Sequence, residues 1–344
     1  MIWKIGLIGF GNVGQGFTRI LAKKREELIR KHNFNFKLIA IADPITGNAY
    51  DERGLNLNGI VRQLDLKGNI RDLEGVRKDI DSLFIIKETD VDIIVEVTPT
   101  NIETGEPGMT HIKTALEYGK HVVTSNKGPI ALAYRELMNL AYRKDVCLRF
   151  EGTVMSGTPS LSLAREALAG CEISKIQGIV NGTTNFILTK MEEGMTYSDA
   201  LKLAQQLGYA ETDPTADVEG WDAAVKAVIL ANTVMDGDIT IKDVEREGIT
   251  KITVDDIKNA LSEGYRIKLL AVVEKAEDGI KASVKPTRVA LTHPLANIMG
   301  VTNALTFTTD HLGEVTLIGP GAGRIETGQA ILSDILHIVR LYSI

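Results

Sequence analysis

Three glycines near the start of the chain, Gly9, Gly11 and Gly14, have the G-x-G-x-x-G spacing of a dinucleotide-binding turn. They directly follow the apolar run Ile2–Ile8, and a long helical pattern follows them. Such a turn lets a pyrophosphate approach the backbone, and the amides at the helix N-terminus bind its negative charge. Because the motif stands between a strand and a helix, we favour nucleotide binding over a glycine-rich turn without ligand. The residues of this turn assigned to the cofactor are Gly9, Gly11, Asn12, Val13 and Gly14.

An aspartate at the end of the second predicted strand bears on which dinucleotide is bound. Asp43 directly follows the run Leu38–Ala42. It lies further from Gly14 than the roughly 20 residues that usually separate the acidic residue from the glycine turn. Its carboxylate could accept hydrogen bonds from the adenosine ribose and would repel a 2′-phosphate, which favours NAD over NADP. An Asp before a proline, here Pro44, also starts turns. The sequence weights these two interpretations equally.

Two lysines have positions suited to acid–base chemistry. Lys127 follows the strand His121–Thr124, and ligands of open parallel sheets bind beyond the carboxyl ends of the strands. Lys226 lies in an apolar helical stretch, and Asp222 is one turn earlier on the same face. Taken alone, the Asp222–Lys226 spacing more often marks a surface pair that supports a helix.

The elements that must position these residues fall into two groups. Strands and helices alternate over the first 150 residues, which predicts parallel βαβ units of Rossmann type. The stretch Pro44–Glu88 gives no clear pattern. Beyond residue 150, Asp278-Gly279 and Leu312-Gly313 separate β-rich runs, which indicates two hairpins.

We therefore expect an α/β protein with a Rossmann-type dinucleotide-binding domain and a mixed α+β catalytic and dimerisation domain. The first would cover residues 1–150 and be completed by residues 316–344. The second, for substrate binding and dimerisation, would cover residues 151–315. Sheet edges and apolar residues between about 285 and 315 favour pairing with a second copy in a homodimer.

Composition excludes several classes of function. Lys and Arg total 39 and Asp and Glu total 45, giving a net charge of −6, and there is no long basic run. A nucleic-acid or polybasic membrane ligand is therefore not expected. No apolar run reaches the ~18–20 residues of a membrane helix, and no signal peptide pattern opens the chain. Two cysteines, Cys147 and Cys171, cannot build a disulfide framework and indicate a cytoplasmic protein.

Four segments taken together closely resemble homoserine dehydrogenase: VTSNKGPIAL, EGTVMSGTPS, the stretch from NGTTNF to GYAETDPTADVEGWDAAVKAV, and GPGAG. The resemblance covers nearly the whole chain, and the spacing of Glu211, Asp222 and Lys226 is its most specific part. It implies NAD(P)-dependent interconversion of L-homoserine and L-aspartate 4-semialdehyde in threonine, methionine and isoleucine biosynthesis. It also implies the short form of the enzyme, without the C-terminal ACT domain.

The resemblance also assigns roles to residues. Lys127 and Lys226 would be the catalytic lysines, and Gly321 and Ala322 would approach the cofactor. Substrate binding is assigned to Thr183, Tyr209, Glu211 and Asp222. A Na⁺ or K⁺ site is assigned to Glu151 and the Val154 carbonyl, with Ser156 and Thr158, because oxygen ligands suit a monovalent cation better than zinc. We also assign to the cofactor the residues that follow the third and fourth strands, Thr98, Pro99, Ser125 and Asn126.

This chemistry is consistent with two lysines. Hydride transfer to an aldehyde builds negative charge on the carbonyl oxygen, which a positioned ammonium stabilises and protonates. Two alternatives stay open: another NAD(P)-dependent small-alcohol dehydrogenase, and a nucleotide-sensing Rossmann regulator, which would have no use for the Glu211, Asp222 and Lys226 cluster. The segment GRIETGQA after GPGAG departs from the Thr-rich helix start of many relatives and bears on cofactor preference.

Overall fold

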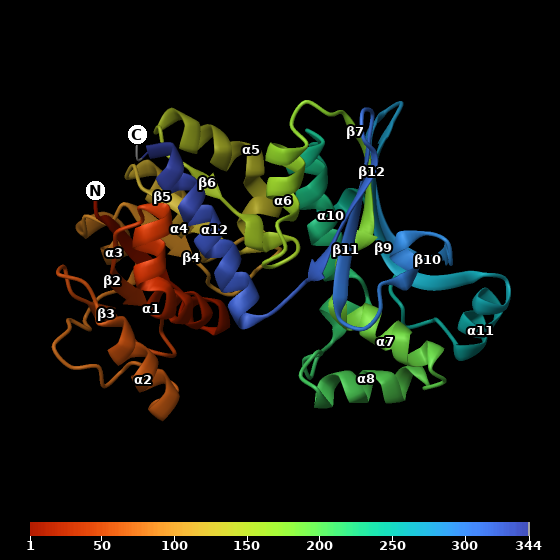
Figure 1. Cartoon of the computed structure of the whole chain (residues 1–344), viewed down its shortest axis with the longest axis horizontal. Helices are drawn as coiled ribbons and strands as arrows, with labels where there is room; N and C mark the ends of the chain where they lie inside the picture. Colours follow the sequence, from red (N-terminus) through yellow and green to blue (C-terminus); the bar gives the residue numbers. More distant parts are fainter. Residues whose placement is uncertain (343–344) are drawn as a thin grey trace. The chain divides into compact units, whose positions relative to one another are not determined.

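The computed structural model describes residues 1–342 and divides the chain into two compact units (Figure 1). The first comprises Met1–Gly157 together with the segment that starts at Gly323, and the second is Thr158–Ala322. The second unit is thus inserted, in chain order, between two parts of the first. None of the described helices is long and apolar enough to cross a membrane.

The first unit is built on a six-stranded sheet of order β3-β2-β1-β4-β5-β6. Every pair is parallel except β2 with β3, and the expected Rossmann-type fold is confirmed. Its strands are β1 (Trp3–Ile8), β2 (Phe36–Ala42), β3 (Ala49–Tyr50), β4 (Ile93–Glu96), β5 (His121–Thr124) and β6 (Leu148–Arg149). Its α-helices are α1 (Asn12–His32), α2 (Leu57–Lys67), α3 (Ser82–Glu88), α4 (Gly108–Glu117), α5 (Lys127–Arg143) and α12 (Arg324–Tyr342). The stretch that gave no sequence pattern thus contains β3, α2 and α3.

The C-terminal helix α12 packs against α1, which begins at the glycine turn. A Cβ placed on Gly16 would stand 2.0 Å from the carbonyl oxygen of Arg324, and one on Gly328 would stand 2.6 Å from the amide nitrogen of Phe17. The two helices therefore approach as closely as they do because both crossing positions lack side chains. Ile331 and Ile335 of α12 belong to the same buried cluster as the apolar face of α1. Residues 323–342 thus complete the core of the first unit.

The second unit is built on a mixed sheet of order β12-β11-β7-β9-β10-β8. Its strands are β7 (Ile173–Ile179), β8 (Val244–Arg246), β9 (Tyr265–Ala276), β10 (Gly279–Ala290), β11 (Thr302–Thr309) and β12 (Gly313–Pro320). β9–β10 and β11–β12 are antiparallel hairpins, which confirms both hairpin predictions. Because β12 pairs with β11 through Pro320, the chain returns to the first unit at Gly323 rather than at residue 316.

Helices accompany this second sheet. They are α6 (Ser160–Ser162), α7 (Gly182–Glu192), α8 (Tyr197–Gln206), α9 (Thr215–Val218), α10 (Trp221–Val234) and α11 (Val254–Ser262). Shorter helical segments of this unit are the 3₁₀ turns Ile241–Asp243 and Pro294–Asn297 and the π-helical segment Leu163–Ala167; the 3₁₀ turn Glu151–Thr153 belongs to the first unit. α10 starts after Gly220, which has φ +80°, and its first two turns carry Asp222 and Lys226.

Candidate active site

The glycine turn has the shape that a dinucleotide pyrophosphate requires. Gly9 has φ +92°, and a Cβ there would lie 2.6 Å from the carbonyl oxygen of Val97. Gly11 is the N-cap of α1 without any side-chain cap, and, apart from its two neighbours in the chain, no residue among 1–342 has a heavy atom within 4 Å of where its Cβ would be. The first turn of α1 carries no acidic side chain. Its open amides therefore suit an anion, as expected for this motif.

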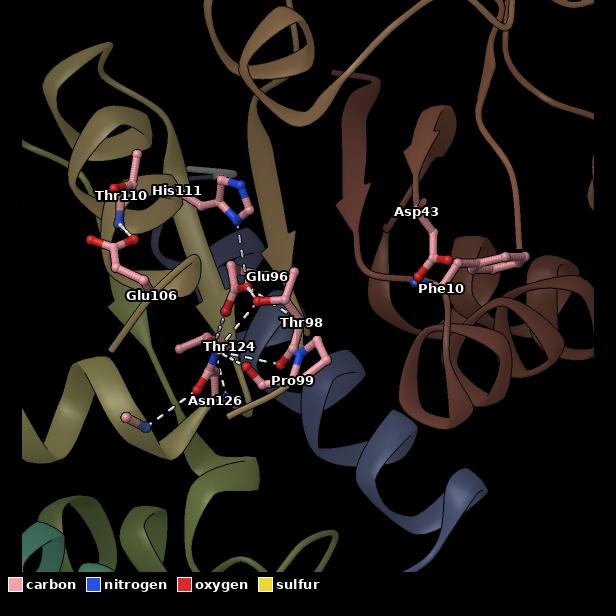
Figure 2. A network of polar contacts seen from close by, with 11 residues as sticks. Phe10, Asp43, Glu96, Thr98, Pro99, Glu106, Thr110, His111, Thr124 and Asn126 are labelled. Carbon is pink, nitrogen blue, oxygen red and sulfur yellow. Dashed lines mark hydrogen bonds and ion pairs between the residues drawn. The ribbon is translucent and has the colours of Figure 1, made fainter. Parts of the chain in front are cut away.

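The Asp43 carboxylate is engaged by the backbone around the glycine turn (Figure 2). One oxygen accepts from the Phe10 amide at 2.7 Å, and the other accepts from the amides of Ile45 and Thr46 at 2.9 and 2.7 Å. Burial raises the pKa of Asp43, but these hydrogen bonds outweigh it and the net pKa is lowered. The contacts support the turn interpretation of Asp43. Its role toward the ribose stays a prediction.

A buried carboxylate beside the loop after β4, that of Glu96, was not predicted from the sequence. Glu96, the last residue of β4, is fully buried; its Oε1 accepts from the Thr98 amide at 3.1 Å and from the Thr98 hydroxyl (Figure 2). Its Oε2 accepts from Thr124 Oγ1 at 3.1 Å, and Oε1 lies 3.7 Å from Nδ1 of His111 in α4. The available signal was a lone acidic residue within the apolar run 93–97.

Asn126 joins the two loops assigned to the cofactor. Its Nδ2 donates to the carbonyl oxygens of Thr98 at 3.3 Å and Pro99 at 3.5 Å. Its Oδ1 accepts from the Gly128 amide at 3.2 Å and caps α5, whose first residue is Lys127. The structure thus brings Thr98, Pro99 and Asn126 together at the carboxyl ends of β4 and β5, with Lys127 at the start of the next helix. Ser125 adjoins Gly152, where a Cβ would lie 2.9 Å from the Cβ of Ser125.

The residues predicted to bind a monovalent cation are divided by the boundary between the units. The predicted residues are Glu151, Val154, Ser156 and Thr158, and all four are buried. Ser156 has φ +52°, and its Oγ lies 2.7 Å from Oγ1 of Thr327 in α12. Thr158 opens the second unit and donates to the carbonyl oxygen of Pro320 at 2.9 Å.

Asp334 in α12 holds the start of the segment 151–158, which contains the predicted cation ligands. This residue was not predicted from the sequence. Its carboxylate accepts from the Glu151 amide at 2.8 Å and from Arg149 Nε at 3.2 Å. Burial raises the pKa of Asp334 to about 7, with Arg149 opposing the shift and Glu151 adding to it. The sequence signal was a single acidic residue within the apolar helix 330–339.

The second unit places Lys226 in a buried polar cluster. Only 7% of Lys226 is exposed; its Nζ donates to Asp222 Oδ2 at 2.6 Å and to the Val180 carbonyl oxygen at 2.7 Å. The surface-pair interpretation of Asp222 and Lys226 is therefore wrong. A buried ammonium held between a carboxylate and a carbonyl is oriented for proton transfer or charge stabilisation.

A second carboxylate, Asp217, completes this cluster and was also not predicted. Asn181 Nδ2 donates to Asp217 Oδ1 at 2.6 Å and to Asp222 Oδ2 at 3.0 Å. Burial raises the pKa of Asp217, and the nearby Asp222 adds to the increase. Asp217 lies in the same segment as Asp222, but on the separate short helix α9, so helical spacing could not connect the two.

The other predicted substrate residues lie around the same segment. Thr183 Oγ1 donates to the Tyr209 carbonyl oxygen at 2.6 Å. The Tyr209 ring packs edge-on against the Phe186 ring, with 5.1 Å between the ring centroids. Glu211 is exposed, and across residues 1–342 its carboxylate has no hydrogen-bond or ion-pair partner. Thr183 and Tyr209 are thus brought together, and the Glu211 side chain is left open to solvent.

The glycines before α12 were also assigned to the cofactor. Gly321 and Ala322 end the second unit. Gly321 lies against Asn303, whose Nδ2 would stand 1.9 Å from a Cβ at that position. The side-chain amide of Asn303 is buried, and no described residue hydrogen-bonds to its Nδ2 or Oδ1. A side chain at position 321 therefore has no room.

One group of described side chains outside these clusters has metal-ligand chemistry. Donor atoms of Cys171, Asp310 and His311 lie within 4.8 Å of one another. Asp310 already accepts from the Glu172 amide at 2.9 Å and pairs with His311 at 3.0 Å, and both Asp310 and His311 are exposed. This group belongs to none of the predicted sites.

Comparison with known proteins identifies the family. A family model described as homoserine dehydrogenase matches residues 159–336, and one described as the homoserine dehydrogenase NAD-binding domain matches residues 9–151. The chain is 45% identical to the NAD(+)-dependent homoserine dehydrogenase of Pseudomonas canavaninivorans, covering 98% of this chain and 96% of that protein. It is 46% identical to the homoserine dehydrogenase of Methanocaldococcus jannaschii, covering 96% and 97%.

The chain is also similar to solved structures of homoserine dehydrogenases. A hyperthermophilic archaeal homoserine dehydrogenase in complex with NADPH has a TM-score of 0.86 at 34% identity, covering 99% of each chain. The homoserine dehydrogenase of Thiobacillus denitrificans has a TM-score of 0.86 at 33% identity, covering 100% of this chain and 74% of that one. The chain belongs to the homoserine dehydrogenase family, and it is an NAD(P)-dependent oxidoreductase that acts on a CH–OH group.

Proposed function

We propose that this chain interconverts L-homoserine and L-aspartate 4-semialdehyde, with Lys226 as the acid–base group. The observation that carries the proposal is the buried Lys226 ammonium, held by Asp222 at 2.6 Å and by the Val180 carbonyl oxygen at 2.7 Å. In reduction the ammonium would stabilise the negative charge that develops on the aldehyde oxygen and then protonate it. In oxidation a neutral Lys226 would accept the hydroxyl proton. The bound dinucleotide supplies or accepts the hydride.

The remaining residues would bind and orient the two reactants. We propose that Lys127, at the start of α5, is the second catalytic lysine. Glu211, Asp222, Tyr209 and Thr183 would bind the amino and hydroxyl ends of the substrate; the open carboxylate of Glu211 suits a substrate ammonium. Gly9, Gly11, Asn12, Val13, Gly14, Thr98, Pro99, Ser125, Asn126, Gly321 and Ala322 would line the cofactor site. The cofactor is NAD or NADP, and we place Asp43, which follows β2, close to its adenosine ribose.

Substitution of Lys226 tests this function. Lys226→Ala should lower turnover with homoserine by roughly 10²–10⁴-fold, because general acid–base catalysis contributes about that much. Wild-type oxidation should accelerate toward alkaline pH, because oxidation needs a neutral lysine to accept the hydroxyl proton. The measurement is absorbance of the reduced nicotinamide as a function of pH. The matched control is Lys258→Ala, on the exposed face of α11.

Two results would remove Lys226 from the mechanism: full activity of the folded Lys226→Ala variant, or an unchanged alkaline dependence in that variant. A wild-type chain that reduces NAD(P) with malate or another hydroxy acid, and not with homoserine, would favour the alternative of a different small-alcohol dehydrogenase.

Three further features are part of the proposal. We propose that the chain forms a homodimer, acts in the cytoplasm in threonine, methionine and isoleucine biosynthesis, and binds Na⁺ or K⁺ through Glu151, the Val154 carbonyl, Ser156 and Thr158. All four are buried, and they offer oxygen ligands only, which suits a monovalent cation.

A further inference from the structure

Arg324 is the first residue of α12 and lies beside the start of α1. Its carbonyl oxygen occupies the space that a side chain on Gly16 would fill, at 2.0 Å from the Cβ position. Because Gly16 lies in the second turn of α1, this contact fixes the N-terminal turn of α12 next to the N-terminal turns of α1. Both helix N-termini belong to the first unit.

The guanidinium of Arg324 extends to the glycine turn itself. Its Nη2 donates to Oδ1 of Asn12, the first residue of α1, at 2.9 Å. A guanidinium has five N–H donors, and among residues 1–342 Asn12 is the only hydrogen-bond partner of this one. Within the same part of the chain, no carboxylate forms an ion pair with Arg324. Its charge is therefore available to a ligand at the turn.

A purely structural role for Arg324 does not account for the position of its guanidinium at the glycine turn. The backbone contacts at Gly16 and Gly328 already fasten α12 to α1, and Ile331 and Ile335 bury its apolar face. An exposed hydrogen bond between Arg324 and Asn12 adds little to that packing. A cation placed at the uncapped amides of α1 would instead add directly to anion binding.

We infer that Arg324 binds the pyrophosphate of the dinucleotide and that Asn12 orients its guanidinium. The inference rests on the proposed function, in which the cofactor lies at the glycine turn. Arg324 then contributes to affinity for NAD and NADP alike, because both carry the same pyrophosphate. It would not discriminate between them, since that requires a contact with the 2′-phosphate.

Direct binding measurements test this assignment without relying on turnover. The dissociation constants of NADH and NADPH are measured by nicotinamide fluorescence for the wild type, Arg324→Gln and Arg340→Gln. Arg340 is the matched control, because it is exposed near the other end of the same helix, roughly 24 Å away at 1.5 Å per residue. Arg324→Gln should weaken both cofactors roughly tenfold, the lower range for a hydrogen bond to a charged group.

The outcomes separate the alternatives. Equal weakening for NADH and NADPH in Arg324→Gln, with Arg340→Gln at wild-type affinity and all three unfolding at similar temperatures, supports the assignment. Weakening of NADPH alone would place Arg324 at the 2′-phosphate and overturn it, as would unchanged affinity or equal weakening in Arg340→Gln. A wild-type chain that binds neither cofactor would instead contradict the proposed function.

Discussion

At the scale of single residues, the Glu96 carboxylate organises the loop after β4. It accepts from the Thr98 amide and hydroxyl and from the Thr124 hydroxyl, and none of Glu96 is exposed. Thr98 and Thr124 lie on the two segments that Asn126 also joins. The conformation of both loops assigned to the cofactor therefore depends on one acidic side chain that has no access to solvent.

Removing this carboxylate should destabilise the protein. Glu96→Ala leaves the Thr98 amide and the Thr124 hydroxyl without their acceptor, so the free energy of unfolding should fall by roughly 1–3 kcal/mol. Glu96→Gln keeps one acceptor oxygen and should cost less. Urea unfolding measures the effect, with Glu103→Ala on the exposed loop 100–107 as the control. Equal stability of Glu96→Ala and the wild type would show that the network contributes nothing.

The sequence predicted functional residues where a motif or a resemblance named them, as for Gly9, Gly14 and Lys226. It missed Glu96, Asp217 and Asp334, because what distinguishes these carboxylates is burial. Burial depends on which elements pack around a residue, and neighbours in the sequence do not reveal it. Lys226 shows the same limit. Its spacing from Asp222 was visible, but the contact with Val180 that removes it from the surface was not.

At the scale of elements, boundaries followed local signals where these were strong. Asp278-Gly279 gave the β9–β10 turn, and Thr196 caps α8 by accepting from the Asp199 amide. β3 has two residues and α3 has seven, which is too short for a clear hydrophobic period. These elements depend on tertiary contacts, such as the pairing of Tyr50 with Arg77, and the sequence did not predict them.

A buried lysine holds three elements of the second unit together. Lys268 on β9 is fully buried, and its Nζ donates to Asn185 Oδ1 of α7 at 3.1 Å and to the Ile298 carbonyl oxygen at 2.7 Å. Asn185 Nδ2 in turn donates to the carbonyl oxygens of Ile298, Gly300 and Thr302. Burial lowers the pKa of Lys268 from 10.5 to about 8, with Glu192 opposing the shift.

Stability should therefore depend on pH through Lys268. Between pH 8 and 10.5 the folded protein has lost a proton that the unfolded chain still holds, so the free energy of unfolding should rise with pH. The gain across this window is roughly 3 kcal/mol at most. Lys268→Met should remove it, while Lys275→Met, exposed on the same strand, should retain it. Urea unfolding at pH 8 and pH 10 measures the gain, and equal pH dependence in all three proteins would contradict this role.

At the scale of the whole molecule, the two fold classes followed from the sequence, because alternating strands and helices dictate parallel βαβ units and Gly-containing turns dictate hairpins. The residue at which the chain returns to the first unit, Gly323, could not be predicted from the sequence. It depends on β12 pairing with β11 along its whole length, and pairing partners are set by tertiary structure.

The proposed homodimer makes a prediction about β12. Among the described strands it is an outer strand of the second sheet, and Ile318 on it is 53% exposed. Unpaired edge strands with apolar side chains favour pairing with another chain. Ile318→Lys should therefore shift the protein toward the monomer in light scattering after size-exclusion chromatography. Leu66→Lys, at a 69% exposed position on α2, is the control, and an unchanged mass for Ile318→Lys would exclude β12 from the interface.

The packing of α12 on α1 has a consequence for how the protein is made. During translation the glycine turn and α1 leave the ribosome before the second unit, yet their core lacks Ile331 and Ile335 until α12 has followed. The inserted unit, residues 158–322, is synthesised in between and needs nothing from α12 for its own sheet. The first unit therefore starts to be synthesised before the second unit, but its core can be completed only after the second unit has been synthesised.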